Sequence, residues 1–176
     1  NFRRNLIKKL LKSGKSIYVL CPKDKQTKKL IKLGCKFVDI NIQNNNINPI
    51  YDFILLKNLM SILSEIKPDY ILNFTIKPLI YGTFIAGFLK IKSISMITGL
   101  GTVFIKKNFI TLIVIFLYRI AFTKAYRVIF QNKDDRKKFI KLKIVKPTKC
   151  ILSPGSGVDL DHFKYEKNYF TTQTNF

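Results

Sequence analysis

The residues with the clearest capacity to bind a ligand are Thr98-Gly99-Leu100-Gly101. A short apolar run, residues 94–97, ends at this segment, and two glycines one residue apart leave backbone N–H groups uncovered by side chains. In α/β proteins, ligands bind beyond the carboxyl ends of parallel strands. Residues 98–101 are therefore predicted to let a diphosphate or a sugar approach the backbone closely, although a plain tight turn would have the same pattern.

A second candidate site follows another apolar run. Asn73 ends that run, and Lys77 comes shortly after it, just before a predicted helix. An ammonium group beside the N–H groups of a helix start can hold a phosphate. Lys77 is therefore a candidate anion ligand, and an ordinary solvent-exposed lysine is the alternative.

The stronger catalytic signatures are absent from the sequence. There is no GxxxxGK[ST], no GxGxxG after the first predicted strand and no HExxH, and the only histidine is His162. This excludes His-based triads and metal sites built on several histidines. The acidic residues before Asn132 are scattered singly, without the pair that glycoside hydrolysis needs. The chain does not itself display a catalytic apparatus.

Composition bounds the possible partners. The 176 residues are 47% hydrophobic, which is enough for one domain with a core. A formal charge of +22, from 32 basic and 10 acidic residues, favours nucleic acid, a phosphorylated ligand or an anionic bilayer surface. The heavy use of lysine, asparagine and isoleucine leaves compositional bias as another explanation. Three cysteines without metal-site spacing fit a reducing cytosol.

Periodicity and turn residues predict alternating helices and strands. This order indicates an α/β fold with a parallel sheet, whose carboxyl edge carries the candidate residues. The helices are predicted at residues 2–11, 25–33, 50–66, 78–89, 109–122 and 132–142, and the strands at residues 16–20, 36–40, 70–74, 94–97, 126–130 and 149–152.

Two predicted helices have unusual surfaces. Residues 2–11 place apolar side chains on one face and lysines or arginines on the other, which suits either a core helix with a solvated face or a contact with a membrane surface. Residues 109–122 form the most hydrophobic segment, but a membrane-spanning helix needs about 20 apolar residues. A buried or interfacial helix is expected there.

Four patches along the chain carry a family resemblance. In the order found here, they resemble the N-terminal domain of family 4 glycosyltransferases, most closely the bacterial enzymes that extend polyprenyl-diphosphate-linked glycans. The patches are Lys77-Pro78 with Tyr81-Gly82, residues 97–101, residues 130–135, and Gly155-Ser156-Gly157-Val158-Asp159 with Phe163.

The resemblance implies one half of a GT-B enzyme, in which two Rossmann-like domains enclose the active site. The N-terminal domain holds the acceptor, while the C-terminal domain holds the nucleotide-sugar and supplies the paired glutamates of an EX7E motif. Transfer is then retaining and needs neither a metal nor a cofactor beyond the nucleotide-sugar co-substrate. Residues 1–163 would be the acceptor-side domain, with helices on both faces of its sheet, and residues 164–176 the start of a linker or a disordered tail. The family's first strand would precede Asn1. The catalytic residues would lie outside this chain, which is expected to be inactive alone.

The same resemblance assigns roles to individual residues. The acceptor side of the cleft is expected to be lined by Asn73, Lys77, Thr98, Gly99 and Gly101, and the domain to be closed by Gly155, Gly157, Val158 and Asp159. Many family members have a histidine near the position of Thr98, and this chain has no histidine there.

The expected partners follow from this assignment. They are a nucleotide-sugar donor held by another domain or chain, a glycan or polyprenyl-diphosphate-linked acceptor, and the inner face of the cytoplasmic membrane, contacted through residues 2–11 and 109–122. Two alternatives stay open, a basic nucleic-acid-binding module and the membrane-anchoring subunit of a split glycosyltransferase. Nucleic acid is disfavoured because the basic residues are spread over several helices without a recognition motif.

Overall fold

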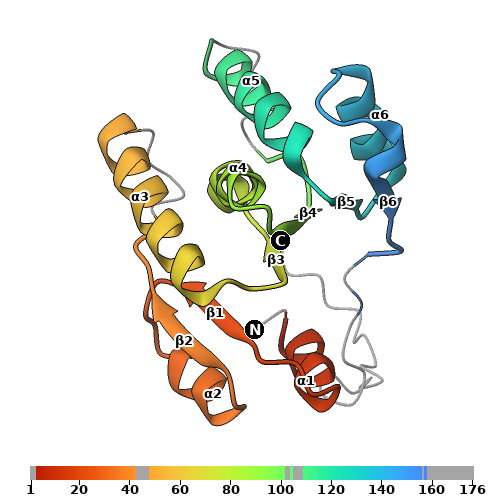
Figure 1. The fold of residues 1–176 in the computed structure, drawn as a ribbon. Helices are drawn as coiled ribbons and strands as arrows, with labels where there is room; N and C mark the ends of the chain where they lie inside the picture. The colour runs from red at the N-terminus through yellow and green to blue at the C-terminus, as the bar shows by residue number, and fades with distance from the viewer. Residues whose placement is uncertain (1–2, 43–47, 102–103, 105–108, 156, 158–176) are drawn as a thin grey trace, which may run out of the picture.

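The computed structural model describes residues 3–42, 48–101, 104, 109–155 and 157, in which helices and strands alternate (Figure 1). Every predicted element is present, with bounds that differ by a few residues. The strands are β1 (Tyr18–Cys21), β2 (Lys36–Asp39), β3 (Tyr70–Asn73), β4 (Lys92–Ile97), β5 (Arg127–Phe130) and β6 (Cys150–Leu152). The helices are α1 (Arg4–Lys12), α2 (Thr27–Lys32), α3 (Pro49–Ile66), α4 (Thr83–Phe88), α5 (Phe109–Lys124) and α6 (Lys133–Lys141). A π-helical segment, η1 (Pro78–Gly82), runs into α4, and a 3-10 turn, η3 (Pro147–Lys149), precedes β6.

All strand pairs are parallel, but the strands form two sheets. One sheet contains β1 and β2, and the other has the order β3-β4-β5-β6. The α1 and α2 helices lie on one side of the strands and α3 to α6 on the other (Figure 1), so the predicted α/β architecture with helices on both faces is confirmed. The prediction of one continuous sheet is not met within the described residues, because β1 and β3 are not paired. The strand expected ahead of Asn1 stays a prediction.

The core of the larger sheet lies under η1, α5 and α6. Side chains alternate along β4, where Ser93, Ser95 and Ile97 are buried and Lys92 is exposed. Phe130 of β5 and Phe139 of α6 pack edge to face, with ring centroids 5.3 Å apart. This aromatic cluster fixes the helices over the strands that carry the candidate site. It is completed by Phe104, Tyr118 and Phe122.

The α3 helix links the smaller sheet to the larger one. Asn48 caps its amino end by accepting a hydrogen bond from the Ile50 backbone N–H, and Pro49 occupies the first turn, where the missing N–H costs nothing. The buried face of α3 packs against Ile40, just after β2, and against Ile85 of α4. Residues from both sheets therefore share this second core. The buried face consists of Leu55, Leu59 and Leu63.

Small residues allow η1 and α4 to pack closely against their neighbours. A Cβ atom at Gly87 would come within 2.3 Å of Lys124 Cβ at the end of α5, and one at Gly82 would lie 2.6 Å from the Asn73 side-chain oxygen. The π-helical turn that precedes α4 was not predicted, because one wider turn does not change the apolar pattern over so few residues.

Candidate functional site

The two predicted ligand-binding segments leave the sheet side by side. In the β3–β4 ladder, Asn73 lies opposite Ser95, so residues 73–77 and residues 98–101 emerge from the same carboxyl edge. They also approach each other, since a Cβ atom at Gly101 would lie 3.5 Å from the Ile76 side chain. The structure therefore brings together the neighbourhoods that the sequence singled out.

The glycine loop after β4 is open to solvent. Thr98, Gly99 and Gly101 are all exposed, and a Cβ atom at Gly99 would meet no atom within 4 Å among the described residues. Gly101 has φ +70°, a left-handed conformation that strongly favours glycine. The loop thus has room beside its backbone for a ligand, and its binding role stays a prediction.

Asn73 points into the protein. It is 6% exposed, and its side-chain amide donates a hydrogen bond to the Thr83 hydroxyl at 3.1 Å. The Thr83 hydroxyl in turn lies 2.8 Å from the Ser95 hydroxyl. This buried polar chain ties β3 and β4 to the start of α4, so the side chain of Asn73 acts here as a structural link beneath the site.

Lys77 is buried in an ion pair. Its ammonium lies 2.6 Å from one carboxylate oxygen of Asp52, and the Tyr81 hydroxyl donates to the other oxygen at 2.9 Å. Only 8% of Lys77 is exposed. The group that was expected to meet a phosphate is therefore engaged with the first turn of α3. Within the described structure it positions η1 and α3 relative to each other.

Sequence reasoning missed Asp52, which was treated as one of several isolated acidic residues. The available signal was weak: Lys77 and Tyr81 are four residues apart and so share a helix face, but nothing in the sequence names their partner. Burial, followed by the hydrogen bond to Asp52 and its charge, raises the pKa of Tyr81 well above its ordinary value of 10.0. The hydroxyl therefore stays protonated and remains a donor to the carboxylate.

The turn between β3 and η1 is strained. Thr75 is β-branched but has φ +62°, a conformation that costs about 1–3 kcal/mol for such residues. The guanidinium of Arg3 covers the neighbouring Phe74 ring, 4.3 Å from its centroid. The residue just before α1 thus also reaches this edge of the sheet, and its burial lowers the pKa of Arg3.

Residues 2–132 match the family model described as "Glycosyl transferase 4-like". The chain belongs to this glycosyltransferase family. It is 28% identical over 171 residues to the N,N'-diacetylbacillosaminyl-diphospho-undecaprenol alpha-1,3-N-acetylgalactosaminyltransferase of Campylobacter jejuni, covering 93% of the chain and 44% of that enzyme. The resemblance drawn from the four patches is thereby confirmed at the level of the family.

Solved structures show the same fold. A glycosyltransferase from Rickettsia africae aligns with a TM-score of 0.66 at 15% identity, over 93% of this chain and 40% of that one. Anabaena Alr3699/HepE, crystallised with UDP and glucose, aligns with a TM-score of 0.66 at 14% identity, over 95% of this chain and 44% of that one. The chain thus spans less than half the length of these proteins.

The last strand of this glycosyltransferase-family chain ends at the same edge. After β6, the backbone N–H of Ser153 donates to the Phe130 carbonyl at 2.8 Å, and the Ser153 hydroxyl donates to the Gly155 carbonyl at 2.9 Å. Gly155 and Gly157 have φ +106° and +70°. Val158, Asp159 and His162 lie outside the described residues, as do the predicted domain boundary at residue 163 and the tail, so those assignments stay predictions.

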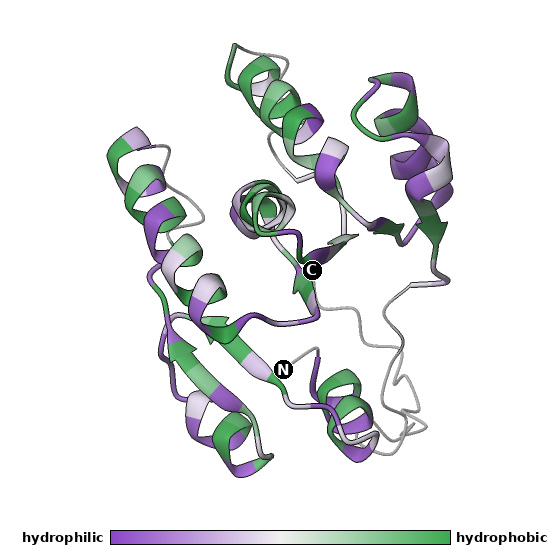
Figure 2. Cartoon of the chain, in the orientation of Figure 1, coloured by the Kyte–Doolittle hydropathy of each residue, from purple (hydrophilic) through white to green (hydrophobic). Residues whose placement is uncertain are grey.

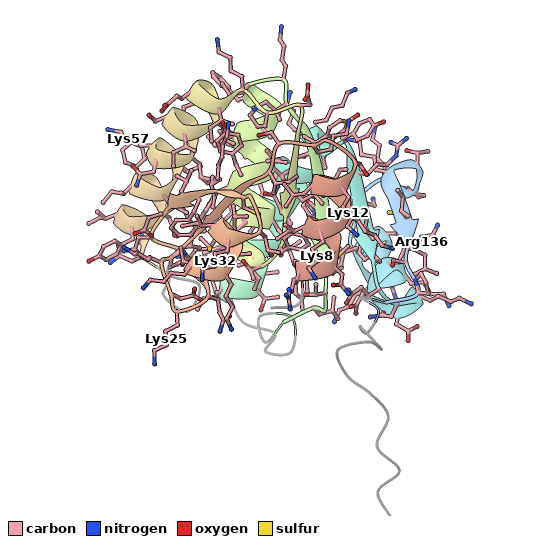
Figure 3. All side chains as sticks on the ribbon, turned by 90° about the horizontal axis from the view of Figure 1, so that it is seen from below. Lys8, Lys12, Lys25, Lys32, Lys57 and Arg136 are labelled. Carbon is pink, nitrogen blue, oxygen red and sulfur yellow. The ribbon has the colours of Figure 1, made fainter. Side chains whose placement is uncertain are left out.

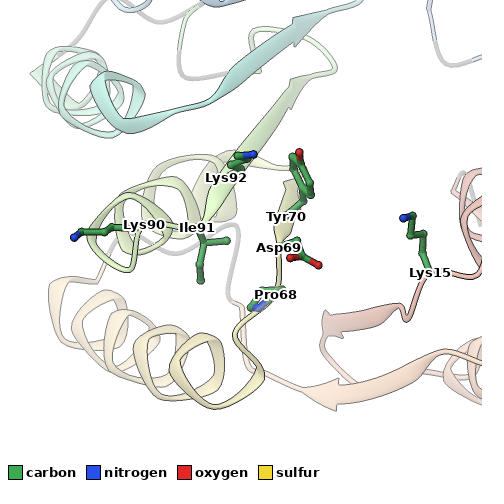
Figure 4. A pocket seen from close by; sticks show the side chains of 7 residues that line it. All are labelled: Lys15, Pro68, Asp69, Tyr70, Lys90, Ile91 and Lys92. Atoms are coloured by element: carbon green, nitrogen blue, oxygen red, sulfur yellow. The ribbon is translucent and has the colours of Figure 1, made fainter.

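A cavity of about 570 Å³ lies at the opposite edge of the strands (Figure 4). It lies between Lys15, just before β1, and the amino ends of β3 and β4, where Asp69 and Lys92 line it. Parallel α/β sheets bind their ligands at the carboxyl edge. We therefore assign the candidate site to the glycine loop and the β3–η1 turn, away from this cavity.

Proposed function

We propose that the chain forms the acceptor-binding part of a retaining, metal-independent glycosyltransferase that transfers a sugar from a nucleotide-sugar to a lipid-linked glycan. The observation that carries the proposal is the 28% identity, across 93% of the chain, to an enzyme named for a diphospho-undecaprenol substrate. The donor would be held by a further domain or a separate chain. The 176 residues alone are expected to show no transfer.

The geometry supports two different roles for the candidate residues, contact with the acceptor and positioning of the site. The exposed Thr98, Gly99 and Gly101 offer backbone N–H groups and space, which suits the diphosphate or first sugar of an acceptor. Asn73 and Lys77 lie beneath and hold the β3–η1 turn in place through Thr83 and Asp52. In this proposal they position the site rather than contact the acceptor.

The test is acceptor binding in detergent micelles. The chain is titrated with a polyprenyl-diphosphate-linked sugar by calorimetry, alongside Gly101→Val. We expect at least about tenfold weaker binding in the variant, because valine is strained at φ +70° and fills the space beside Ile76. Gly14→Val is the matched control, since Gly14 has φ +74° at the end of α1, away from the site. Equal affinity in all three proteins, or no binding at all, contradicts the proposal.

The spread of charge does not favour the nucleic-acid alternative. Figure 3 shows basic side chains on α1, α2, α3 and α6 rather than along one groove or one helix. Such a distribution provides attraction to anions without a recognition element. We propose that it serves a position at the inner face of the cytoplasmic membrane, where the lipid-linked acceptor would be found.

A further inference from the structure

The α5 helix is apolar on two sides, and the core accounts for only one of them. Its inner face buries Tyr118, Ala121 and Phe122. Its outer face exposes Phe109, Leu112 and Phe116 by 75%, 63% and 60%, at helical spacing. A helix that is hydrophobic all round is normally buried or in contact with lipid. The outer face of α5 therefore needs a partner that packing among the described residues does not supply.

The amino-terminal half of α3 adds to this surface. Ile50, Phe53 and Ile54 are exposed there, whereas the exposed positions in the second half are polar. Figure 2 shows hydrophobic ribbon at the free ends of both helices. The η1 and α4 segments pack between α3 and α5. We call the exposed apolar side chains of the two helices the outer apolar surface: Ile50, Phe53, Ile54, Phe109, Leu112 and Phe116.

This surface borders the candidate site. The α3 and α5 helices both begin after a strand ends, on the carboxyl side of the sheets. Asp52, in the first turn of α3, is bound to Lys77 in the segment that follows β3. The α5 helix begins shortly after the glycine loop that ends at Gly101. A partner that covers the outer apolar surface would therefore lie beside the opening of the site.

Charge favours an anionic bilayer as the partner. The α4 and α5 helices contain no acidic residue. In α3, Asp52 is already paired with Lys77, and Glu65 lies in the half of the helix away from the outer apolar surface. Lys57 of α3 is exposed, with its ammonium 5.0 Å from the centroid of the Phe53 ring. Apolar side chains flanked by lysine, in a chain with a net charge of +22, suit the interface of an anionic membrane. None of the described helices is long and apolar enough to cross a membrane.

The structure separates this surface from the basic helix α1. The sequence predicted that residues 2–11 and 109–122 both contact the membrane. However, α1 and α2 lie on the opposite side of the strands from α3 and α5 (Figure 1). Lys8 and Lys12 are seen on that other side in Figure 3. A flat bilayer against the outer face of α5 would not reach them.

We propose that the outer apolar surface inserts into the interface of an anionic bilayer and presents the neighbouring carboxyl edge to the lipid headgroups. A lipid-linked acceptor could then reach residues 98–101 while its tail stays in the membrane. The presentation of residues 98–101 to an acceptor rests on the proposed function. The membrane contact itself does not depend on an acceptor.

Vesicle co-sedimentation tests the proposal. The chain is mixed with vesicles of phosphatidylcholine and phosphatidylglycerol that contain no lipid-linked sugar. We expect the double variant L112S/F116S to bind at least about tenfold more weakly, because two large apolar side chains no longer enter the interface. Ile31→Ser is the matched control, since Ile31 is 52% exposed on α2, and it should leave binding unchanged. The charge reversal K8E/K12E should weaken binding by less than about threefold.

Several outcomes would overturn the proposal. These are unchanged vesicle binding in L112S/F116S, loss of binding in K8E/K12E alone, and a wild-type dimer that becomes monomeric in L112S/F116S without any vesicle binding. Circular dichroism confirms that the exposed substitutions leave the fold intact. Because the vesicles lack acceptor and the micelle titration lacks a bilayer, failure of the membrane contact is distinguishable from failure of acceptor binding.

Discussion

Asp52 joins two helical segments through one carboxylate. Its two oxygens accept hydrogen bonds from Lys77 and Tyr81, so the first turn of α3 is attached to η1 beside the candidate site. The side chains of Lys77 and Asp52 are only 10% and 16% exposed. A buried ion pair contributes little net stability, but removing one partner is costly because the other charge is left buried and unpaired.

Asp52→Asn is expected to lower the free energy of unfolding by about 3 kcal/mol, because the Lys77 ammonium stays buried without its counter-charge. Urea denaturation followed by circular dichroism measures the change. Glu65→Gln, an exposed substitution on the same helix, should stay within about 0.5 kcal/mol of the wild type. Equal effects of the two substitutions would show that the ion pair does not fasten α3.

Because of Tyr81, the free energy of unfolding is expected to vary with pH in the alkaline range. Its folded-state pKa is raised, mainly by burial, so the neutral form is favoured by folding. The associated stability is complete below the ordinary tyrosine pKa of about 10 and is lost as pH rises above it, because the unfolded chain then ionises first. Urea midpoints at about pH 8 and about pH 11 should differ less in Tyr81→Phe than in the wild type. Tyr70→Phe, at an exposed tyrosine, should keep the wild-type difference.

The residues of the candidate site were predictable to different degrees. The exposure of the glycine loop follows from its composition, since glycines after an apolar run mark a turn. Asn73 and Lys77 lie in the segments expected to form the site, but their side chains point inward. That direction depends on which face of β3 meets α4 and on the π-helical turn at Pro78, and neither is encoded in residue type.

At the level of elements, the sequence was informative because each strand is a short apolar run bounded by turn residues. Asn132 caps the predicted helix α6 by accepting a hydrogen bond from the Asp135 backbone N–H at 2.7 Å. The separation of β1–β2 from β3–β6 could not be read locally, because pairing between strands depends on the edges that they present to one another. Only the α5 part of the outer apolar surface could be predicted from the sequence. The exposed apolar side chains of α3 have the same spacing as side chains that face a core.

The close approach of α4 and α5 gives a prediction for these helices. In Gly87→Ala, the new Cβ would meet Lys124 Cβ, and the helices would have to move apart. We expect a loss of about 1–3 kcal/mol in the free energy of unfolding, measured by urea denaturation. Adding Lys124→Gly removes the opposing atom. The double variant should therefore lose less free energy of unfolding than the two single variants lose together. Simple additivity would argue against a direct clash.

On the scale of the whole molecule, basic and exposed apolar side chains are distributed differently. Basic side chains lie on α1 and α2 and also on α3 and α6, while the outer faces of α3 and α5 are apolar near the candidate site. A net charge of +22 attracts the chain to an anionic membrane from a distance, and the apolar side chains can then determine how it docks. Long-range attraction and orientation would thus be carried by different parts of the molecule.

The two sheets should also differ in local stability. Both β4 and β5 pair on each side, and Val128 and Phe130 of β5 are fully buried. In contrast, β1 and β2 each pair with one strand within the described residues, and β1 contains no buried residue. Backbone amides exchange through local opening where few buried contacts oppose it. The end of the molecule with β1 and β2 is therefore expected to open without unfolding the larger sheet.

Hydrogen–deuterium exchange with mass spectrometry tests this difference. Peptides from β1 and β2 should exchange at least about tenfold faster than peptides from β4 and β5. The α3 helix is an internal reference, because its buried leucines contact residues from both ends and should show intermediate protection. Uniform protection would mean that the chain unfolds as one unit. Faster exchange confined to β1 and β2 would instead show that the β3–β6 sheet, which carries the candidate site, holds its structure independently of the smaller sheet.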